Sequence, residues 1–468
     1  MNNLMKRKKI PSSFRDPSAY LFYYNNLIYR QLNLIYKEDY DHLMNSGLYK
    51  VLVDQELLNP HEEVNIDEKD FGNSNDAYKI IKPDLISFIS YPYEWSFSQL
   101  KDAALVTLKI QRISIEFGMS LKDSSAYNIQ FKNGKPVLID TCSFEKYNEG
   151  QPWIAYRQFC QHFLGPLALM CYSDIRLNQL FRIYIDGIPL DLTSSLLPFR
   201  SRLKFSLFTH IHSHAKSQRY FADKFIKVNN NGFKVSRLSF LGLIDNLESA
   251  VRSLKWKRYN TEWADYYENT NYSMDGFQHK KQVVEDYLDR IKSSSLWDIG
   301  ANEGVFSRIA SNKGIQTISF DIDPAAVEKS YIRGIKNDEL NVLPLLLDLT
   351  NPSPGIGWEN QERMSVIDRG PTDTVIALAL IHHLAICNNL PFNKISSFFY
   401  KICNFLIIEF VPKGDSQVQR MLSTREDIFP NYTQQFFEDE FAKYFNIQDC
   451  VVIRESERIL YLMKRRDV

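Results

Sequence analysis

The sequence predicts an α/β protein whose C-terminal part is a doubly wound parallel sheet. From about residue 277 onward, short apolar runs alternate with helical patterns, and strands separated by helices favour parallel pairing. A glycine-containing turn, DIGANEG, directly follows the first of these runs. The last two runs, IQDCVVIRES and RILYLMKRR, are close enough in the chain to pair as an antiparallel hairpin at the end of the sheet.

The length of 468 residues exceeds what one ordinary hydrophobic core organises, so we expect at least two domains. An N-terminal domain is predicted at residues 1–205 and the sheet domain at residues 281–468. Residues 206–280 combine one helical stretch with polar segments, and we interpret them as a mostly helical connector.

The N-terminal domain shows a helix followed by a hairpin, which predicts an α+β fold. Apolar residues recur at helical spacing over residues 100–117, and Gly118 ends the helix. The runs YNIQF and PVLID then flank the pair Asn133-Gly134, which is the strongest short-range hairpin signal. Residues 153–192 are mostly apolar and are predicted to be largely helical.

The sheet domain is predicted to alternate helices and strands along its length. Its strands, in order, are LWDIG, TISFDID, LPLLLDL, DTVIALAL and LIIEFV, and the closing hairpin follows them. Helices are predicted over HKKQVVEDYLDRI and from Val305 and Pro324.

The composition excludes several classes of partner. The 56 basic residues equal the 56 acidic ones, so no overall field draws the protein to nucleic acid or to an anionic membrane. The basic N-terminus has no apolar segment behind it, and nowhere do 18 apolar residues follow one another. The six cysteines form no CxxC pair, and the run HIHSH has no nearby acid or cysteine to complete a metal site. We expect a cytoplasmic protein with no metal, no nucleic-acid partner and no membrane partner, and the sequence does not indicate its oligomeric state.

The stretch LWDIGANEGVFSRIA has the character of a cofactor-binding turn. An apolar strand ends at Asp298, the small residues Gly300, Ala301 and Gly304 follow, and a helix begins directly after them. Glycine lets the backbone turn sharply and lets a ligand approach it, while the helix N-terminus offers free N–H groups. Asp321 ends the second strand 17 residues after Gly304, where an acid would hydrogen-bond a ribose diol in an α/β nucleotide fold.

Asp348 ends the third strand at the same edge of the sheet, where a carboxylate can accept a hydrogen bond from an adenine amine. The order DIGANEG, DID, LDL and ALALIHHL resembles motifs one to four of the class I S-adenosylmethionine (SAM)-dependent methyltransferases, over roughly residues 277–466. This resemblance implies a seven-stranded Rossmann-like sheet and SAM as the cofactor. The cofactor-binding residues it implies are Asp298, Gly300, Ala301, Asn302 and Gly304 around the methionine, Asp321 with Ile322 at the ribose, and Asp348 with Leu349 at the adenine.

A pyridine-dinucleotide enzyme is the main alternative for a glycine turn followed by an acid. Such an enzyme is expected to carry G-x-G-x-x-G, whose middle glycine lets a pyrophosphate lie close to the backbone. The stretch GANEGVF lacks that glycine, which favours the methyltransferase.

The methyl acceptor is indicated only by class. The fourth strand ends in ALIHHLAI and not in the Pro-Pro-aromatic motif of methyltransferases that act on bases or amides. His382 and His383 lie at the cofactor edge, where a histidine could take a proton from an acceptor hydroxyl, and Glu409 is a second candidate base. Each of the three could instead be a buried, partnered side chain. Four aromatic residues precede the domain and could either cover the pocket or pack in the core: Trp263, Tyr266, Tyr267 and Tyr272.

A second motif, in the N-terminal domain, resembles the catalytic loop of protein and aminoglycoside kinases. Asp123, Asn128 five residues later and Asp140 beyond the hairpin have the order of the acceptor-positioning and Mg²⁺-binding residues of those enzymes. Leu121 replaces the usual histidine, no glycine-rich loop precedes, and Lys79 lies only 44 residues before Asp123, which is too close for the phosphate-binding lysine. The three polar residues are therefore a possible phosphate or metal site on a scaffold that resembles a kinase C-lobe.

Nearly the whole chain resembles a bacterial family of NoeA-related nodulation proteins, also described as class I methyltransferases. The residues that carry this resemblance include YPYEWSFSQLKDAAL, PVLIDTCSFE and NPSPGIGWENQER. We expect a SAM-dependent methyltransferase that acts on a small molecule or saccharide at an oxygen atom. Two alternatives remain open: a bifunctional kinase and methyltransferase, or a methyltransferase whose N-terminal domain only binds the acceptor.

Overall fold

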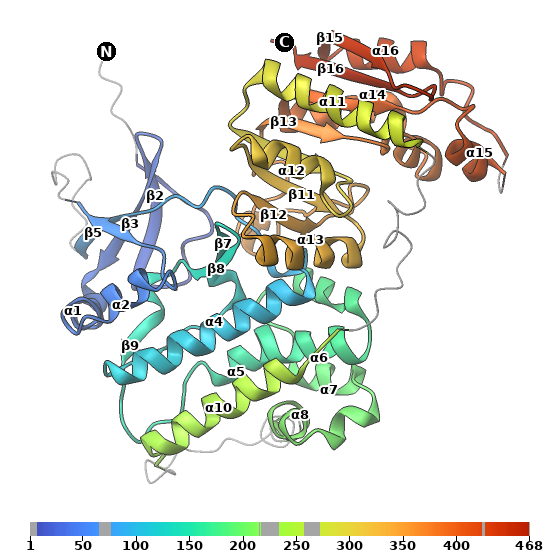
Figure 1. Ribbon diagram of the computed structural model, residues 1–468. Helices are drawn as coiled ribbons and strands as arrows, with labels where there is room; N and C mark the ends of the chain where they lie inside the picture. The colour runs from blue at the N-terminus through green and yellow to red at the C-terminus, as the bar shows by residue number, and fades with distance from the viewer. Residues whose placement is uncertain are drawn as a thin grey trace, which may run out of the picture. The chain divides into compact units, whose positions relative to one another are not determined.

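The chain forms two compact units in a computed structural model that describes residues 7–64, 76–214, 216, 234–256, 272–423 and 426–467. Unit 1 comprises residues 1–257 and 356–363, and unit 2 comprises residues 258–355 and 364–468. Figure 1 shows the helices and strands of both units.

Unit 1 begins with a five-stranded antiparallel sheet in the described residues, in the order β1-β2-β3-β5-β4. Its strands are β1 (Lys8–Lys9), β2 (Ala19–Tyr24), β3 (Leu27–Asn33), β4 (His61–Glu63) and β5 (Ala77–Pro83). Two helices, α1 (Lys37–Asn45) and α2 (Leu48–Asp54), lie between β3 and β4 in the chain. Leu32 of β3 and Tyr40 of α1 are both fully buried in one apolar cluster, which holds α1 to the sheet.

The helix predicted over residues 100–117 is confirmed as α4 (Phe97–Glu116). Its N-cap is Ser96, whose hydroxyl accepts a hydrogen bond from the backbone N–H of Gln99. The side-chain oxygen of Gln99 accepts a hydrogen bond from the backbone N–H of Ser96, which completes a capping box. The predicted hairpin is also present, as β7 (Ile129–Lys132) and β8 (Lys135–Leu138). Asn133 and Gly134 between them have positive φ values of 51° and 72°, as a tight hairpin turn requires.

The rest of unit 1 is mostly helical. Its elements are the paired strands β6 (Met119–Leu121) and β9 (Phe144–Lys146), the helices α5 (Tyr156–Phe159), α6 (Gly165–Tyr172), α7 (Leu190–Leu196), α8 (Phe205–Leu207) and α10 (Arg237–Ser253), and several 3₁₀ and π turns. The first four residues of the run HIHSH lie in a π-helical segment, Phe208–Ser213, and His214 caps its end. Among the described residues no group of three acidic, histidine or cysteine side chains has the geometry to hold a metal.

A short segment between two strands of unit 2 belongs to unit 1. Ile356 and Arg363 pair through two backbone hydrogen bonds, and the guanidinium of Arg363 lies 4.6 Å from the ring centre of Tyr127. Glu362 accepts two hydrogen bonds from Arg15, at 2.6 and 3.0 Å. This segment is part of NPSPGIGWENQER, so the conspicuous sequence has a packing role in unit 1.

The described part of unit 2 contains a seven-stranded sheet in the order β12-β11-β10-β13-β14-β16-β15. The strands are β10 (Ser295–Ile299), β11 (Gln316–Asp321), β12 (Val342–Leu346), β13 (Thr372–Ala377), β14 (Cys403–Phe410), β15 (Phe445–Val452) and β16 (Ile459–Arg465). The first five pair in parallel, and β16 pairs antiparallel to both β14 and β15. The predicted parallel α/β sheet and its closing hairpin are thus confirmed.

Helices cover both faces of this sheet. They are α11 (Met274–Ile291), α12 (Val305–Asn312), α13 (Pro324–Asn337), α14 (Phe392–Ile402), α15 (Ser416–Leu422) and α16 (Gln434–Ala442). Leu460 and Leu462 of β16 pack in one cluster with residues of α11 and α12. Tyr461 between them points to the opposite face, where its ring lies 5.3 Å from Phe437 of α16.

The described residues include no helix that combines the length and the hydropathy needed to cross a bilayer.

Candidate cofactor-binding site

Unit 2 has a cavity at the carboxyl ends of β10, β11, β12 and β13. All the sequence-predicted cofactor residues except Gly304 line it: Asp298, Gly300, Ala301, Asn302, Asp321, Ile322, Asp348 and Leu349. The fold explains the convergence, because strands that run in parallel bring their carboxyl ends to one edge of the sheet. The cavity wall also includes Tyr272, Phe277 and Lys280, which come from α11 and the two residues before it.

The two glycines of the turn after β10 have different roles. Gly300 has a φ of +78°, and the backbone N–H groups of Gly300 and Ala301 both donate to the carbonyl of Phe320. Gly304 has a φ of +79°, and a Cβ there would lie 2.9 Å from Nη1 of Arg308. Gly304 therefore allows the start of α12 to pack closely, whereas Gly300 lies at the cavity wall.

Asp321 ties the end of β11 to the glycine turn. One carboxylate oxygen accepts a hydrogen bond from the backbone N–H of Asn302 at 2.7 Å, and the other accepts from the N–H of Asp323 at 2.8 Å. The side chain is 8% exposed, and burial raises the pKa of Asp321 to about 6, although the backbone donors oppose that rise.

Asp298 is the more deeply buried of the two acids. Its Oδ2 accepts a hydrogen bond from the hydroxyl of Ser307 at 2.6 Å. Burial, with a smaller contribution from the neighbouring Asp321, raises the pKa of Asp298 to about 7. Two carboxyl groups with raised pKa values thus lie together at the cavity. A cationic ligand would lower the pKa of both groups, because a nearby positive charge favours the ionised form.

Asp348 lies at the third strand end, as predicted. Its Oδ1 accepts hydrogen bonds from the backbone N–H of Thr350 at 2.9 Å and from the Thr350 hydroxyl at 2.6 Å. This turn fixes the carboxyl group of Asp348 at the cavity wall. Asp348 follows β12, which lies next to β11, the strand that ends at Asp321.

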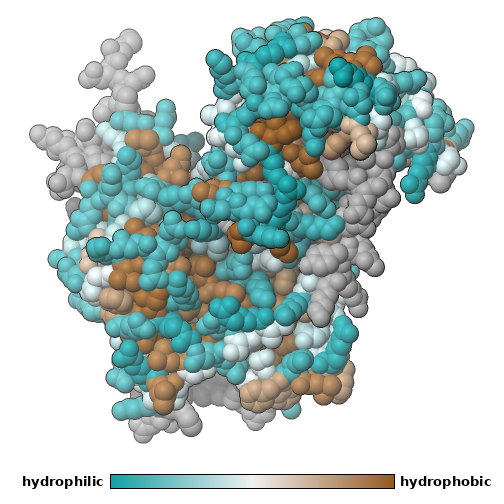
Figure 2. Space-filling view, viewed as in Figure 1, coloured by the Kyte–Doolittle hydropathy of each residue, from teal (hydrophilic) through white to brown (hydrophobic). Residues whose placement is uncertain are grey.

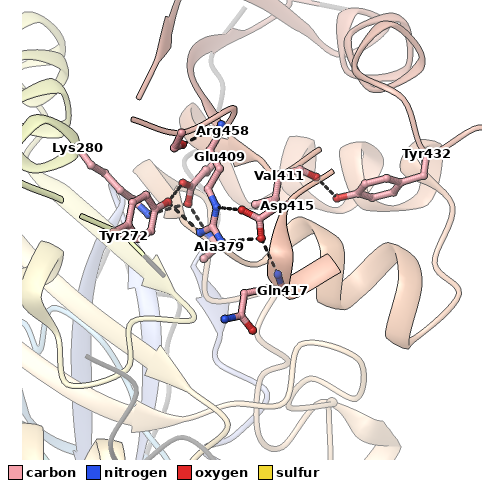
Figure 3. Close-up of polar contacts among 10 residues, drawn as sticks. Tyr272, Lys280, Ala379, Glu409, Val411, Asp415, Gln417, Tyr432 and Arg458 are labelled. Carbon is pink, nitrogen blue, oxygen red and sulfur yellow. Dashed lines mark hydrogen bonds and ion pairs between the residues drawn. The ribbon is translucent and has the colours of Figure 1, made fainter. Parts of the chain in front are cut away.

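A buried polar network lies behind the cavity wall (Figure 3). Glu409 on β14 is 0% exposed and forms an ion pair with Lys280, N to O 2.7 Å. The same carboxylate accepts hydrogen bonds from the backbone N–H of Ala379 at 2.7 Å and from the hydroxyl of Tyr272. Burial alone would raise the pKa of Glu409, but the cations Lys280 and Arg458 more than offset it, so its pKa lies below the usual value.

Glu409 is therefore not suited to the predicted role of proton acceptor. It is ionised at neutral pH, its oxygens are engaged by three donors, and it is not among the residues that line the cavity. The structure instead gives it a positioning role, because it joins Lys280, Tyr272 and the end of β13.

Arg458 completes this network from the turn before β16. It is 2% exposed, and it forms a bidentate pair with Asp415, at 2.7 and 3.0 Å. Its Nη1 donates to the hydroxyl of Tyr272 at 2.9 Å. The ring of Tyr272 has both Arg458 and Lys280 against it, at 4.6 and 4.7 Å from the ring centre.

The other three aromatic residues predicted to cover or pack near the pocket lie outside the described residues: Trp263, Tyr266 and Tyr267.

The histidine pair divides between cavity and core. His383 lines the cavity, whereas His382 is 2% exposed and is not part of the wall. Burial, together with Arg458, lowers the pKa of His383 to about 4, and burial also lowers the pKa of His382 well below its usual value. Both imidazoles are neutral at physiological pH, and only His383 is placed to accept a hydrogen bond from a ligand in the cavity.

In unit 1 the structure brings together the residues that resemble a kinase loop. The side-chain amide of Asn128 donates to Asp123 at 3.0 Å, and the hydroxyl of Ser143 donates to Asp140 at 2.8 Å. Arg30 of β3 forms a partly buried ion pair with Asp140. Burial alone would raise the pKa of Asp140, but chiefly Arg30 holds it below its usual value.

Sequence reasoning missed Lys280 and Arg30. Lys280 is the lone charge within the buried stripe of α11, and Arg30 is the lone charge of the strand run LIYRQLN. A charged residue in an apolar pattern is the signal that would have found both, since burial requires a partner. Lys79, which the spacing disfavours as a phosphate-binding lysine, forms an ion pair with Glu63, N to O 2.5 Å.

Unit 2 is an α/β domain with a largely parallel sheet, and its glycine turn and acidic strand ends lie at the carboxyl edge, where open α/β sheets bind their ligands. No family model matches the chain. It is 33% identical over 464 residues to the nodulation protein NoeA of Rhizobium meliloti (strain 1021), over 98% of this chain and 96% of that protein. The chain belongs to the NoeA family.

Solved structures similar to part of the chain include methyltransferases. The methyltransferase domain of bacterial CtHen1 is 14% identical, with a TM-score of 0.30, over 41% of this chain and 98% of that one. Magnesium protoporphyrin IX methyltransferase from Synechocystis PCC 6803, with bound SAH, is 16% identical, with a TM-score of 0.31, over 44% and 93%. A structure of WbdD is 11% identical, with a TM-score of 0.29, over 44% and 43%.

We predict that Glu409→Ala will destabilise unit 2 by about 3–5 kcal/mol, because it leaves the buried ammonium of Lys280 without its partner. Native-state hydrogen exchange of the amides in β10 and β13 measures this free energy. Adding Lys280→Met should restore part of the loss. The matched control is Asp427→Ala, which breaks the solvent-exposed pair with Lys413 and should leave the exchange nearly unchanged, because solvent screens such pairs. Unchanged exchange in Glu409→Ala would contradict the role assigned to this network.

Proposed function

We propose that unit 2 is a SAM-dependent methyltransferase domain. The observation that carries this proposal is the pair of buried carboxyl groups, Asp298 and Asp321, at the glycine turn. SAM carries a sulfonium, an ammonium and one carboxylate, so its net charge is positive. Its binding beside two acids whose burial is unfavourable in the charged form offsets part of that cost.

The charge of the cavity disfavours the dinucleotide alternative. Three carboxyl groups and one ammonium line it, and that ammonium, of Lys280, is already paired with Glu409. A pyrophosphate would bring two more negative charges to this place.

The residues of the wall suit the parts of SAM. Asp321 would hold the ribose diol, Asp348 the adenine amine, and the turn at Gly300 with Asp298 the methionine end. The cofactor supplies an electrophilic methyl group on its sulfonium. We infer that the neutral imidazole of His383 accepts a hydrogen bond from the acceptor hydroxyl and orients it, while its low pKa makes it a weak base. Catalysis then depends mainly on position.

The acceptor we propose is a hydroxyl group of a small molecule or saccharide. The segment ALIHHLAI at the carboxyl end of the fourth strand lacks the motif that binds a planar amide or base. It instead places His383, a hydrogen-bond acceptor, at the cavity wall. A hydroxyl would donate to such an acceptor and attack the methyl group in line, so that the C–O bond forms as the C–S bond breaks, S-adenosylhomocysteine leaves, and the hydroxyl proton passes by way of His383 to solvent.

For unit 1 we propose an acceptor-binding module on a scaffold that resembles a kinase, without phosphoryl transfer. In protein kinases a lysine on the third strand serves the phosphates, and an aspartate beyond the hairpin binds Mg²⁺. Here the third strand carries Arg30, and Asp140 is engaged by Arg30, by the hydroxyl of Ser143 and by the N–H of Cys142. The bifunctional kinase is the alternative that the test below decides.

The first prediction is that Asp321→Ala weakens SAM binding by about tenfold to a hundredfold, since it removes a charged hydrogen-bond acceptor from the ribose site. Isothermal titration calorimetry with SAM measures it. Asp439→Ala, an exposed acid on α16, is the control and should bind as wild type does. No heat of binding in the wild type, or equal affinity in both variants, would refute the cofactor assignment.

The second prediction concerns pH. An acid with a raised pKa loses its charge as the pH falls through that value, so Asp298 and then Asp321 become neutral below about pH 7 and about pH 6. The affinity for SAM should therefore fall by up to about tenfold per pH unit for each acid that must lose a proton on binding. S-adenosylhomocysteine, which lacks the sulfonium charge, should show a weaker dependence in the same titrations. An affinity for SAM that does not change over this range would count against the charge argument.

The third prediction is that Mg²⁺-ATP gives no thermal shift with the full chain, because Arg30 already occupies the carboxylate of Asp140. Differential scanning fluorimetry measures it. A shift that disappears in Asp140→Asn, but persists in the exposed control Asp54→Asn on α2, would favour the bifunctional kinase.

A further inference from the structure

Unit 1 presents large apolar side chains to solvent over a short stretch, PFRSRLKFSLF. Phe199, Leu203 and Phe205 are 73%, 76% and 76% exposed, and Phe208 is 48% exposed. They lie on the 3₁₀ turn Phe199–Leu203 and on α8 with its continuation. We call residues 199–208 the basic-aromatic patch. Figure 2 shows apolar side chains gathered where Figure 1 places α8.

The cations of the basic-aromatic patch alternate with its apolar residues. Arg200, Arg202 and Lys204 are all exposed. From residue 192 to residue 216 the chain has these three and Lys216 but no aspartate or glutamate. Burial lowers the pKa of each of the three histidines of HIHSH, so they add no positive charge at neutral pH. The patch is thus of one sign, in a protein whose total charge is balanced.

Buried contacts on the inner side hold the patch in this orientation. Ser201 is 0% exposed, and its hydroxyl bonds to His212 at 2.9 Å and to the carbonyl of Pro198 at 2.7 Å. Leu207 and Ile211 are 2% and 0% exposed. The inner residues are therefore well packed, and the apolar residues named above point outward because the fold places them there.

We propose that the basic-aromatic patch docks unit 1 on an anionic lipid surface. Bulky apolar side chains enter the boundary between head groups and acyl chains, and interleaved cations meet the negative head groups. Long basic side chains also keep their charge in the head-group layer while their stems lie on apolar surface. The core of a protein interface is instead depleted in charged residues, and a nucleic-acid surface has no use for several protruding apolar side chains.

This proposal departs from the expectation of no membrane partner. That expectation rested on balanced net charge and on the lack of an apolar run long enough to span a bilayer. Surface docking needs neither a span nor a net positive protein, only a local patch.

Vesicle co-sedimentation of the full chain tests the proposal. The vesicles are phosphatidylcholine alone, or phosphatidylcholine mixed with phosphatidylglycerol. The wild type should bind the mixed vesicles at least about tenfold more tightly than it binds vesicles of phosphatidylcholine alone. The apolar variant Phe199→Ser, Leu203→Ser, Phe205→Ser should weaken binding to mixed vesicles at least about tenfold. The charge variant Arg202→Gln, Lys204→Gln should remove most of the preference for phosphatidylglycerol.

The matched control is Ile35→Ser with Leu85→Ser, which removes two other apolar side chains of unit 1 that are 72% and 73% exposed. It should bind as wild type does, and circular dichroism should show all variants folded. The proposal is wrong if the wild type does not bind the mixed vesicles, or if both patch variants bind them unchanged. It is also wrong if the apolar variant instead converts an oligomer to a monomer in sedimentation velocity, because the patch would then be an interface between copies of the chain.

Discussion

The buried ion pair between Lys280 and Glu409 is the interaction on which unit 2 depends. It joins α11 to β14. Glu409 also accepts hydrogen bonds from the N–H of Ala379, just after β13, and from the hydroxyl of Tyr272, so it fixes these two residues of the cavity wall. Arg458 and Asp415 extend it to the closing hairpin and α15. A charge buried this deeply is tolerable only with its partner in place, so these elements are held in one arrangement.

The same pair determines the charge that a ligand meets in the cavity. Because Glu409 neutralises Lys280, the acids of the glycine turn and of the neighbouring strand ends are left without a cation of their own at the wall. Burial raises the pKa of Asp298 and Asp321, so ionising these acids is costly, and under the proposed function a cationic cofactor would offset that cost. Under the proposed function, the preference for SAM over a dinucleotide would depend on the contact between Lys280 and Glu409, because that contact neutralises the ammonium at the wall.

Local pattern was enough to predict the sheet of unit 2 and its acidic strand ends, since Asp298, Asp321 and Asp348 each follow an apolar run directly. It was not enough for Glu409, which ends a run in the same way but meets Lys280, 129 residues earlier in the chain. Gly304 was predicted to contact the cofactor, but the side chain of Arg308, from the helix that Gly304 begins, occupies the space where a Cβ at residue 304 would lie. Arg30 and the five-stranded sheet of unit 1 depend on pairings between distant strands, which no short stretch encodes. Contacts of this kind require the fold.

The central claim is that unpaired buried carboxyl groups select a cationic cofactor. The most direct measurement is the pKa of Asp298 by carboxyl-carbon NMR of ¹³C-aspartate-labelled protein, with Asp298→Asn to assign the signal, in the free protein and with SAM bound. We expect a pKa near 7 in the free protein and a value lower by about one unit or more with SAM, because the nearby positive charge favours the ionised carboxyl group. An ordinary pKa in the free protein, or a raised pKa that SAM leaves unchanged, would contradict the claim.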